Sequence, residues 1–283
     1  MKLILCPTDF SPSALHAARY ACGLASTFKA RIVLLHSFES AIMYSEMPFT
    51  SIEDADQQMQ QAMQKKLNAQ MQKLKREFKS LSFEIVIARG LSHQQIVKSA
   101  KKLKADMIIL GATGTSKLER LLMGSTTAKV IRDAHCPVLS VPLHAEYSGI
   151  KKIVFSTDLK EDNVHSAQLL IPFAKKLNAE IAFLFIDDKN ILHDDKEVEK
   201  IMGKIKKRIH YPALSGYISK YNSVSKGIES FLGKSQADML AMFTHPKHFP
   251  ESLFHSSMTQ LMSHHTGIPL LALKKVDKSL IGS

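Results

Sequence analysis

The feature that most constrains the fold is an internal repeat within the 283 residues. Residues 2–36 align without a gap with the stretch 149 positions later, and residues 105–139 align with the stretch 132 positions later. A repeat of this length indicates a duplicated domain rather than a solenoid unit. We therefore expect two tandem domains, residues 1–145 and residues 150–275, joined by a short linker.

Each copy alternates short apolar runs with segments of helical spacing. In the first copy the runs that predict strands are residues 2–7, 31–36, 83–88, 107–110 and 137–141. Strands that alternate with crossover helices indicate a parallel, doubly wound sheet with helices on both faces. The predicted fold class is therefore α/β, with two Rossmann-like domains.

A long helix is predicted between the second and third strands. One stripe of this helix carries apolar residues spaced by threes and fours. These are Met59, Met63, Leu67, Met71, Leu74 and Phe78. Such a stripe is far more typical of core than of a binding surface, so we expect it to be buried.

A glycine-rich segment follows the fourth strand of the first copy. Gly111 and Gly114 break the apolar run, and Gly124-Ser125-Thr126-Thr127 opens the next helix. Glycine lets backbone N–H groups approach a phosphate, and a helix N-terminus offers unpaired donors and a positive dipole end. The pattern predicts an anion cradle, although glycines that only shape turns would give the same spacing.

The second copy has lost this cradle. At the positions of Gly111, Gly114 and Gly124 it carries Phe243, Pro246 and Ser256. A phenylalanine side chain fills space that a phosphate would need, and proline removes a backbone donor. We therefore expect one anion site per chain.

Asp9 follows the first strand directly, as Gly111 follows the fourth. In a doubly wound sheet the carboxyl ends of the strands gather at one edge, where ligands bind. Asp9 is thus a candidate for accepting hydrogen bonds from ribose hydroxyls or for holding a divalent metal, and its alternative role is to cap the following helix. The sequence holds no P-loop, dinucleotide fingerprint or nucleophile elbow.

Charge and composition limit the classes of partner that the chain is expected to bind. The formal net charge of +12 favours anionic ligands, but the lysines are scattered along helix-like segments, so we do not expect a nucleic-acid partner. No apolar run reaches the ~18 residues that a membrane span needs, so we expect no membrane partner. The three cysteines, in apolar surroundings, fit a reducing cytoplasm better than a disulfide framework.

Five histidines gather late in the second copy. Their irregular spacing favours a polar surface over a metal site. If the cluster binds zinc, His245 and His248 are the best pair of ligands.

These motifs resemble the universal stress protein family in its tandem, two-domain form. Gly111-x-x-Gly114-x9-Gly124-Ser125 is similar to the ATP-binding pattern of that family, and Pro7-Thr8-Asp9-Phe10-Ser11 resembles the end of its first strand. The resemblance implies adenine-nucleotide alpha-hydrolase-like domains that pair through their final strands as an intrachain pseudo-dimer. Whether two chains also associate as a homodimer stays an open question at this point.

The resemblance also implies a cofactor, ATP or AMP/ADP, with Mg²⁺ as an open addition, and a role for each matching residue. Pro7, Thr8 and Asp9 would border adenine and ribose, and Ser37, where the family usually has an apolar residue, would offer its backbone to adenine. The phosphates would be held by Gly111, Gly114, Gly124, Ser125 and Thr126.

No residues near the cradle pair a nucleophile with a general base at a recognisable spacing. We therefore expect a nucleotide-responsive regulatory protein of the stress response. The alternative is a slow ATPase or an adenylyl-handling enzyme of the same fold.

Overall fold

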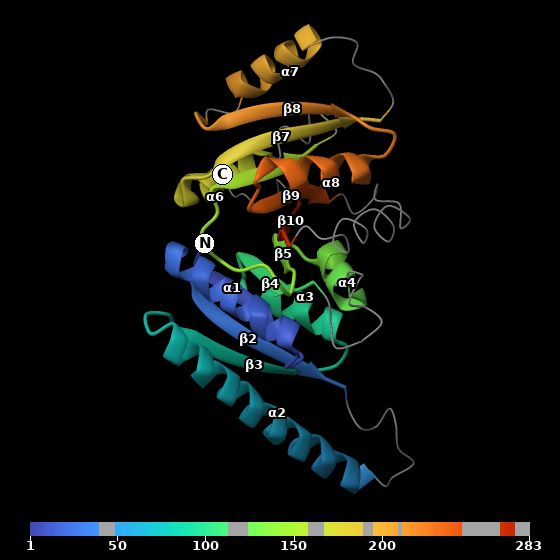
Figure 1. Cartoon of the computed structure of the whole chain (residues 1–283). Coiled ribbons are helices and arrows are strands. Elements are labelled where there is room, and N and C mark those ends of the chain that lie inside the picture. The colour runs from blue at the N-terminus through green and yellow to red at the C-terminus, as the bar shows by residue number, and fades with distance from the viewer. Residues whose placement is uncertain are drawn as a thin grey trace, which may run out of the picture. The chain divides into compact units, whose positions relative to one another are not determined.

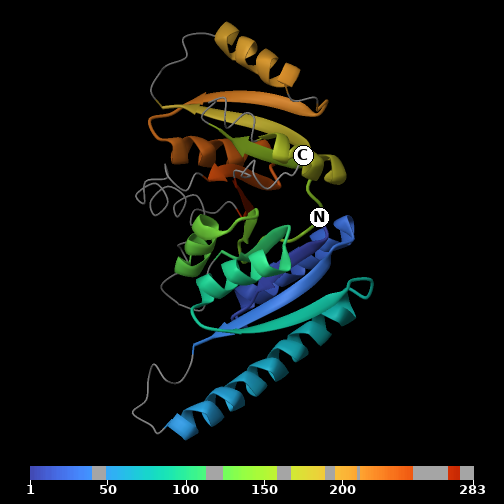
Figure 2. The same cartoon turned by 180° about the vertical axis from the view of Figure 1, so that it is seen from behind.

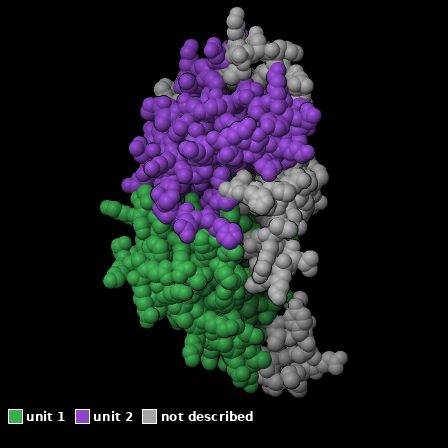
Figure 3. Space-filling model, viewed as in Figure 1, with its two compact units in different colours: residues 1–117, 124–143 green, residues 118–123, 144–283 purple. Residues whose placement is uncertain are grey.

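The computed structural model describes residues 1–39, 49–112, 124–157, 167–188, 195–208, 211–244 and 267–274. The chain divides into two compact units (Figure 3). Unit 1 contains residues 1–117 and 124–143, and unit 2 contains residues 118–123 and 144–283.

Strands and helices alternate along unit 1, as the sequence predicts. Its elements are β1 (Leu3–Pro7), α1 (Pro12–Phe28), β2 (Arg31–Phe38), α2 (Phe49–Glu77), β3 (Phe83–Arg89), α3 (Ser92–Leu103), β4 (Met107–Gly111), α4 (Ser125–Asp133) and β5 (Val138–Val141). The strands are parallel and lie side by side in the order β3-β2-β1-β4-β5. The doubly wound α/β fold is therefore confirmed for this unit.

The sheet of unit 1 is covered on both faces. Helix α1 packs against β1, β4 and β5 and touches α2, while α3 and α4 pack against each other on the opposite face. Figure 1 shows α1 in front of the sheet, and Figure 2, from behind, shows α3 and α4 in front. Because both faces are covered, the central strands are apolar throughout, and Ile4, Leu5, Ile108 and Ile109 have no exposed surface.

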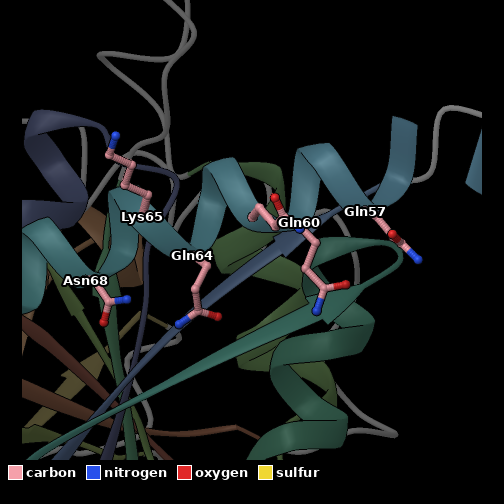
Figure 4. Close-up of a pocket in the computed structure, with 6 residues that line it drawn as sticks. Gln57, Gln60, Gln64, Lys65 and Asn68 are labelled. Atoms are coloured by element: carbon pink, nitrogen blue, oxygen red, sulfur yellow. The ribbon is translucent and has the colours of Figure 1, made fainter. Parts of the chain in front are cut away.

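Helix α2 is buried only in part. Leu67 and Leu74 of the predicted apolar stripe are fully buried, but Met59 is 45% exposed, so the prediction of a buried stripe is wrong for Met59. Towards its N-terminal half, the helix borders a shallow hollow of about 540 Å³ (Figure 4). Its lining is almost entirely amide side chains: Gln57, Gln60, Gln61, Gln64, Lys65 and Asn68.

Unit 2 repeats the topology of unit 1. Its described elements are β6 (Lys152–Ser156), a 3₁₀ turn (Ala167–Leu169), α6 (Ile171–Leu177), β7 (Glu180–Asp187), α7 (Asp195–Arg208), β8 (Leu214–Lys220), α8 (Val224–Ser235), β9 (Met239–Thr244) and β10 (Leu270–Lys274). The strands are again parallel, in the order β10-β9-β6-β7-β8. The two units thus share one strand order, which is the structural counterpart of the sequence repeat.

One aspartate ties the same two strands together in each unit. In unit 1, Asp106 Oδ2 accepts hydrogen bonds from the backbone N–H groups of Lys2 (2.7 Å) and Leu3 (2.9 Å). In unit 2, Asp238 Oδ2 accepts the equivalent pair from Lys151 and Lys152 at 2.7 and 2.9 Å. This aspartate anchors the start of the first strand to the start of the fourth, so the fold requires it in both copies.

Within the described residues, no helix combines the length and the apolar character that crossing a lipid bilayer would require.

Candidate functional site

The candidate site lies at the carboxyl edge of the sheet in unit 1. The strand order reverses direction at β1, whose neighbours are β2 on one side and β4 on the other. This point between β1 and β4 is where doubly wound sheets bind ligands. Continuing the two registers beyond Pro7 places Asp9 level with Ser37 on one side and Ala112 on the other. Three segments that the sequence singles out therefore meet along one edge.

Thr8 is a structural anchor of this edge. Its backbone N–H donates to Leu35 O (2.8 Å), and its hydroxyl accepts from Phe10 N (3.0 Å) and donates to Gln70 Oε1 of α2 (3.1 Å). Its carbonyl accepts a hydrogen bond from His36 Nδ1 (2.7 Å). With the side chain 6% exposed and every polar group engaged, Thr8 positions the turn after β1.

The turn after β1 is tight and strained. Asp9 Oδ1 accepts from Ser11 N (2.9 Å), which leaves the rest of this exposed carboxylate facing solvent. Phe10 has a φ of 64°, a left-handed conformation that is costly for a bulky residue and is concentrated at functional sites. The helix cap is Ser11, whose hydroxyl accepts from Ala14 N (3.1 Å), so Asp9 is left available for another role.

The end of β2 places two polar side chains on opposite faces. His36 stacks against Phe10, with ring centroids 4.4 Å apart, and Lys66 of α2 lies 6.0 Å from the same Phe10 ring. Ser37 points the other way, where its hydroxyl donates to Ser92 Oγ (2.9 Å) at the start of α3. The residue that the family resemblance assigns to adenine is therefore half-buried and linked to the α3 N-terminus.

Gly111 ends β4 and has no room for a side chain. A Cβ built there would lie 2.4 Å from Ser13 Oγ of α1 and 3.2 Å from the Ser13 backbone carbon and oxygen. Its φ is not in the left-handed region, so the glycine is required by close packing rather than by backbone conformation. Gly111 therefore has a structural role, in bringing the start of α1 against the end of β4, whatever it binds.

The start of α4 is fastened to the end of β4 by two hydrogen bonds. Gly124 N donates to Ala112 O (2.8 Å), and Thr127 Oγ1 donates to Gly111 O (2.9 Å). The N–H of Gly124 is thus already used. The next backbone N–H groups, those of exposed Ser125, half-buried Thr126 and buried Thr127, belong to a first turn, whose donors have no partner inside an α-helix.

Several predicted site residues fall outside the described part of the chain, namely Gly114, His245 and His248. Among the described residues, no group of three or more His, Cys, Asp or Glu side chains could hold a metal ion. Near the cradle, Asp9 is the carboxylate that sequence analysis proposed for a divalent metal, and one of its oxygens is already engaged.

Sequence reasoning missed four residues that shape the edge: Ser13, His36, Gln70 and Thr127. His36 adjoins Ser37, and Ser13 lies four positions after Asp9, but only the folded chain reveals that Ser13 lies against Gly111 and that His36 bonds to Thr8. Gln70 lies 62 positions from Thr8, on a helix that the sequence describes only by its apolar stripe. Thr127 belongs to the Gly124-Ser125-Thr126-Thr127 segment, and its place in the first helical turn is the feature of the sequence that could have identified it.

The equivalent position in unit 2 holds a large side chain. Phe243 on β9 stands where unit 1 has Gly111, and it is 7% exposed. The second copy therefore carries a buried aromatic side chain at the position where the first copy has a tightly packed glycine.

Comparison with known proteins gives a match over the first half of the chain. The model of the universal stress protein family matches residues 1–142. The chain belongs to the universal stress protein family. Universal stress protein MJ0531 of Methanocaldococcus jannaschii is 32% identical over 144 residues, covering 50% of this chain and 81% of that protein. Universal stress protein MJ0577 of the same organism is 28% identical over 152 residues, covering 50% of this chain and 94% of that protein.

A solved structure extends the likeness in fold to both halves of this universal stress protein. A universal stress protein from Archaeoglobus fulgidus superimposes with a TM-score of 0.70 and 15% identity. The match covers 98% of this chain and 97% of that chain. The tandem arrangement of two such domains is therefore found in another member of the family.

Proposed function

We propose that unit 1 binds one adenine nucleotide, ATP or its ADP and AMP forms, and that its occupancy makes the chain a nucleotide-responsive regulator in the stress response. The observation that carries this proposal is the meeting of Asp9, Ser37, Gly111 and the start of α4 along the edge at the strand switch point. The family to which the chain belongs and its Gly-x-x-Gly-x9-Gly-Ser pattern support it.

The phosphates belong at the start of α4 in this proposal. The first turn offers backbone N–H donors and the positive end of the helix dipole, which together favour anions. Ser125 is exposed and Thr126 half-exposed, so their hydroxyls are accessible to a ligand. Thr127 and Gly124 hold this turn against β4, so the donors are already in place before the nucleotide arrives.

The ribose and base belong further along the same edge, beside Asp9 and Ser37. The exposed carboxylate oxygen of Asp9 can accept hydrogen bonds from ribose hydroxyls. Ser37 follows on the neighbouring strand, level with Asp9. When Mg²⁺ accompanies the nucleotide, Asp9 is the described side chain that would face it from this edge.

We propose a single nucleotide per chain. In unit 2, Phe243 replaces Gly111 and is buried, so backbone and phosphate cannot approach each other there in the same way. A stoichiometry of one is therefore expected for the whole chain.

Mass spectrometry of the chain purified without added nucleotide, followed by calorimetric titration with ATP, tests the proposal. The decisive variant is Ser125→Asp, with Ser125→Asn as its neutral control of equal size. A carboxylate in the first turn of α4 favours the helix but repels phosphate, so Ser125→Asp should weaken ATP binding about tenfold or more. Its thermal midpoint should not fall, and Ser125→Asn should bind ATP nearly as the unchanged chain does.

Equal ATP affinity in the aspartate and asparagine variants would refute the proposal that the phosphates bind at the start of α4. A measured stoichiometry of two nucleotides per chain would contradict the proposal that unit 2 binds none. Steady release of ADP by the unchanged chain, abolished in Ser125→Asp, would favour the ATPase over the regulator.

A further inference from the structure

A buried hydroxyl without a partner lies at the switch point. Ser13 is 5% exposed, and within the described part of the chain its Oγ makes no hydrogen bond. The same atom is the nearest neighbour of the Cβ position that Gly111 leaves empty, at 2.4 Å. Ser13 therefore places an unused hydrogen-bonding group directly against the first glycine of the cradle.

Packing alone does not explain this hydroxyl. A buried polar group that lacks a partner destabilises the folded state, and native proteins hold few such groups without a functional reason. Alanine would avoid the penalty at this position. It also suits a first helical turn, since the capping contact to Ala14 N comes from Ser11 rather than from Ser13.

The surroundings of Ser13 suit an anion. Ser13 is the second residue of α1, a helix of 17 residues whose N-terminus lies at the point between β1 and β4. The dipole of α1 therefore presents its positive end there, as α4 does from the other face. Because Gly111 has no side chain, no Cβ separates the Ser13 hydroxyl from the end of β4.

We propose that the Ser13 hydroxyl is a ligand group of the nucleotide site, which donates a hydrogen bond to an oxygen of the bound phosphate chain. This inference rests on the proposed function, because it assigns one more contact within the same site. Ser13 would then complete its hydrogen bonding only in the ligand-bound state. This would explain why the Ser13 hydroxyl has no hydrogen-bond partner in the chain without ligand.

The test is Ser13→Ala, studied by calorimetric titration with ATP and with inorganic tripolyphosphate, and by thermal unfolding without ligand. Loss of a hydrogen bond to a charged oxygen should weaken binding of both ligands about tenfold or more. The thermal midpoint of the free variant should equal or exceed that of the unchanged chain, because an unpaired buried group has been removed. A merely structural serine would give the opposite result, a lower midpoint.

Two further variants keep the test decisive. Ser13→Cys retains a similar shape with a much weaker donor, so it should lose affinity as the alanine variant does. Ser140→Ala is the matched control, because Ser140 on β5 is also fully buried without a partner among the described residues. Ser140 pairs with Leu110 within the sheet and is not among the residues that the proposal places at the nucleotide, so this variant should keep its ATP affinity.

Absence of ATP binding by the unchanged chain would refute the proposed function, and this inference with it. ATP binding that Ser13→Ala and Ser13→Cys leave unchanged would refute this inference alone. Weaker binding of ATP with unchanged binding of tripolyphosphate would also overturn it, because the hydroxyl would then not act on phosphate.

Discussion

Replacing Gly111 by alanine should destabilise unit 1 through one specific contact. The added Cβ would lie 2.4 Å from Ser13 Oγ, closer than non-bonded atoms can approach, and 3.2 Å from the Ser13 backbone carbon and oxygen. The first contact is the more severe of the two, and the second is also tighter than an ordinary van der Waals contact. Because α1 must then shift away from β4, we expect the loss that overpacking usually brings, about 1–3 kcal/mol.

Urea denaturation followed by circular dichroism measures this loss. With a denaturant slope of about 1–3 kcal/mol per molar, the midpoint should fall by roughly 1 M. Since the chain has two units, hydrogen exchange with mass spectrometry should place the loss in unit 1 rather than in unit 2.

The double variant Gly111→Ala with Ser13→Ala isolates the contact. Removing Oγ eliminates the closest approach, so the double variant should recover about half or more of the stability that Gly111→Ala loses. Gly233→Ala in α8 is the control, because its Cβ would meet nothing within 4 Å and helical alanine is favoured over glycine. Wild-type stability of Gly111→Ala, or a double variant no better than the single, would refute the packing role of this glycine.

Three further predictions concern contacts elsewhere in the chain. Asp106→Ala and Asp238→Ala should each lower the free energy of unfolding by about 1–3 kcal/mol in urea titrations, because each aspartate accepts an equivalent pair of backbone hydrogen bonds in its own unit. A large difference between the two losses would contradict the equivalence of the two units. Leu67→Ala should cost about 2–5 kcal/mol in the same assay, because the side chain is fully buried, and a neutral effect would show that α2 does not form part of the core. Burial raises the pKa of Cys6 well above its ordinary value, and burial followed by the charge of Glu77 raises the pKa of Cys22 to about 12. The native state thus holds both thiols neutral, so stability should decline as the pH rises above about 9, where unfolded thiols ionise, and Cys22→Ala should make that decline shallower.

Much of the fold could be predicted from the sequence, because parallel strands that are buried on both faces appear in it as short continuous apolar runs. Each apolar run in the first copy became a strand within one or two residues of its predicted bounds. The repeat at shifts of 149 and 132 positions predicted two units, and Asp106 and Asp238 make the same contacts in each. The apolar stripe of α2 was less informative. Periodicity reports which residues share a face of a helix, not how far the sheet beneath that helix extends, and Met59 is exposed.

The candidate site divides along similar lines. The residue types of the candidate site are visible in the sequence: glycines before and at a helix start, Asp9 after a strand, and Phe243 in place of Gly111 in the second copy. Which of these groups already have hydrogen-bond partners can be read only from the folded chain. The hydroxyl of Thr8 is engaged by Gln70, the N–H of Gly124 is engaged by Ala112, and Ser13 lies unpaired against Gly111. These contacts join residues that lie up to 98 positions apart in the sequence. Such residues are brought together by the order of the strands and the packing of the helices, which local sequence does not reveal.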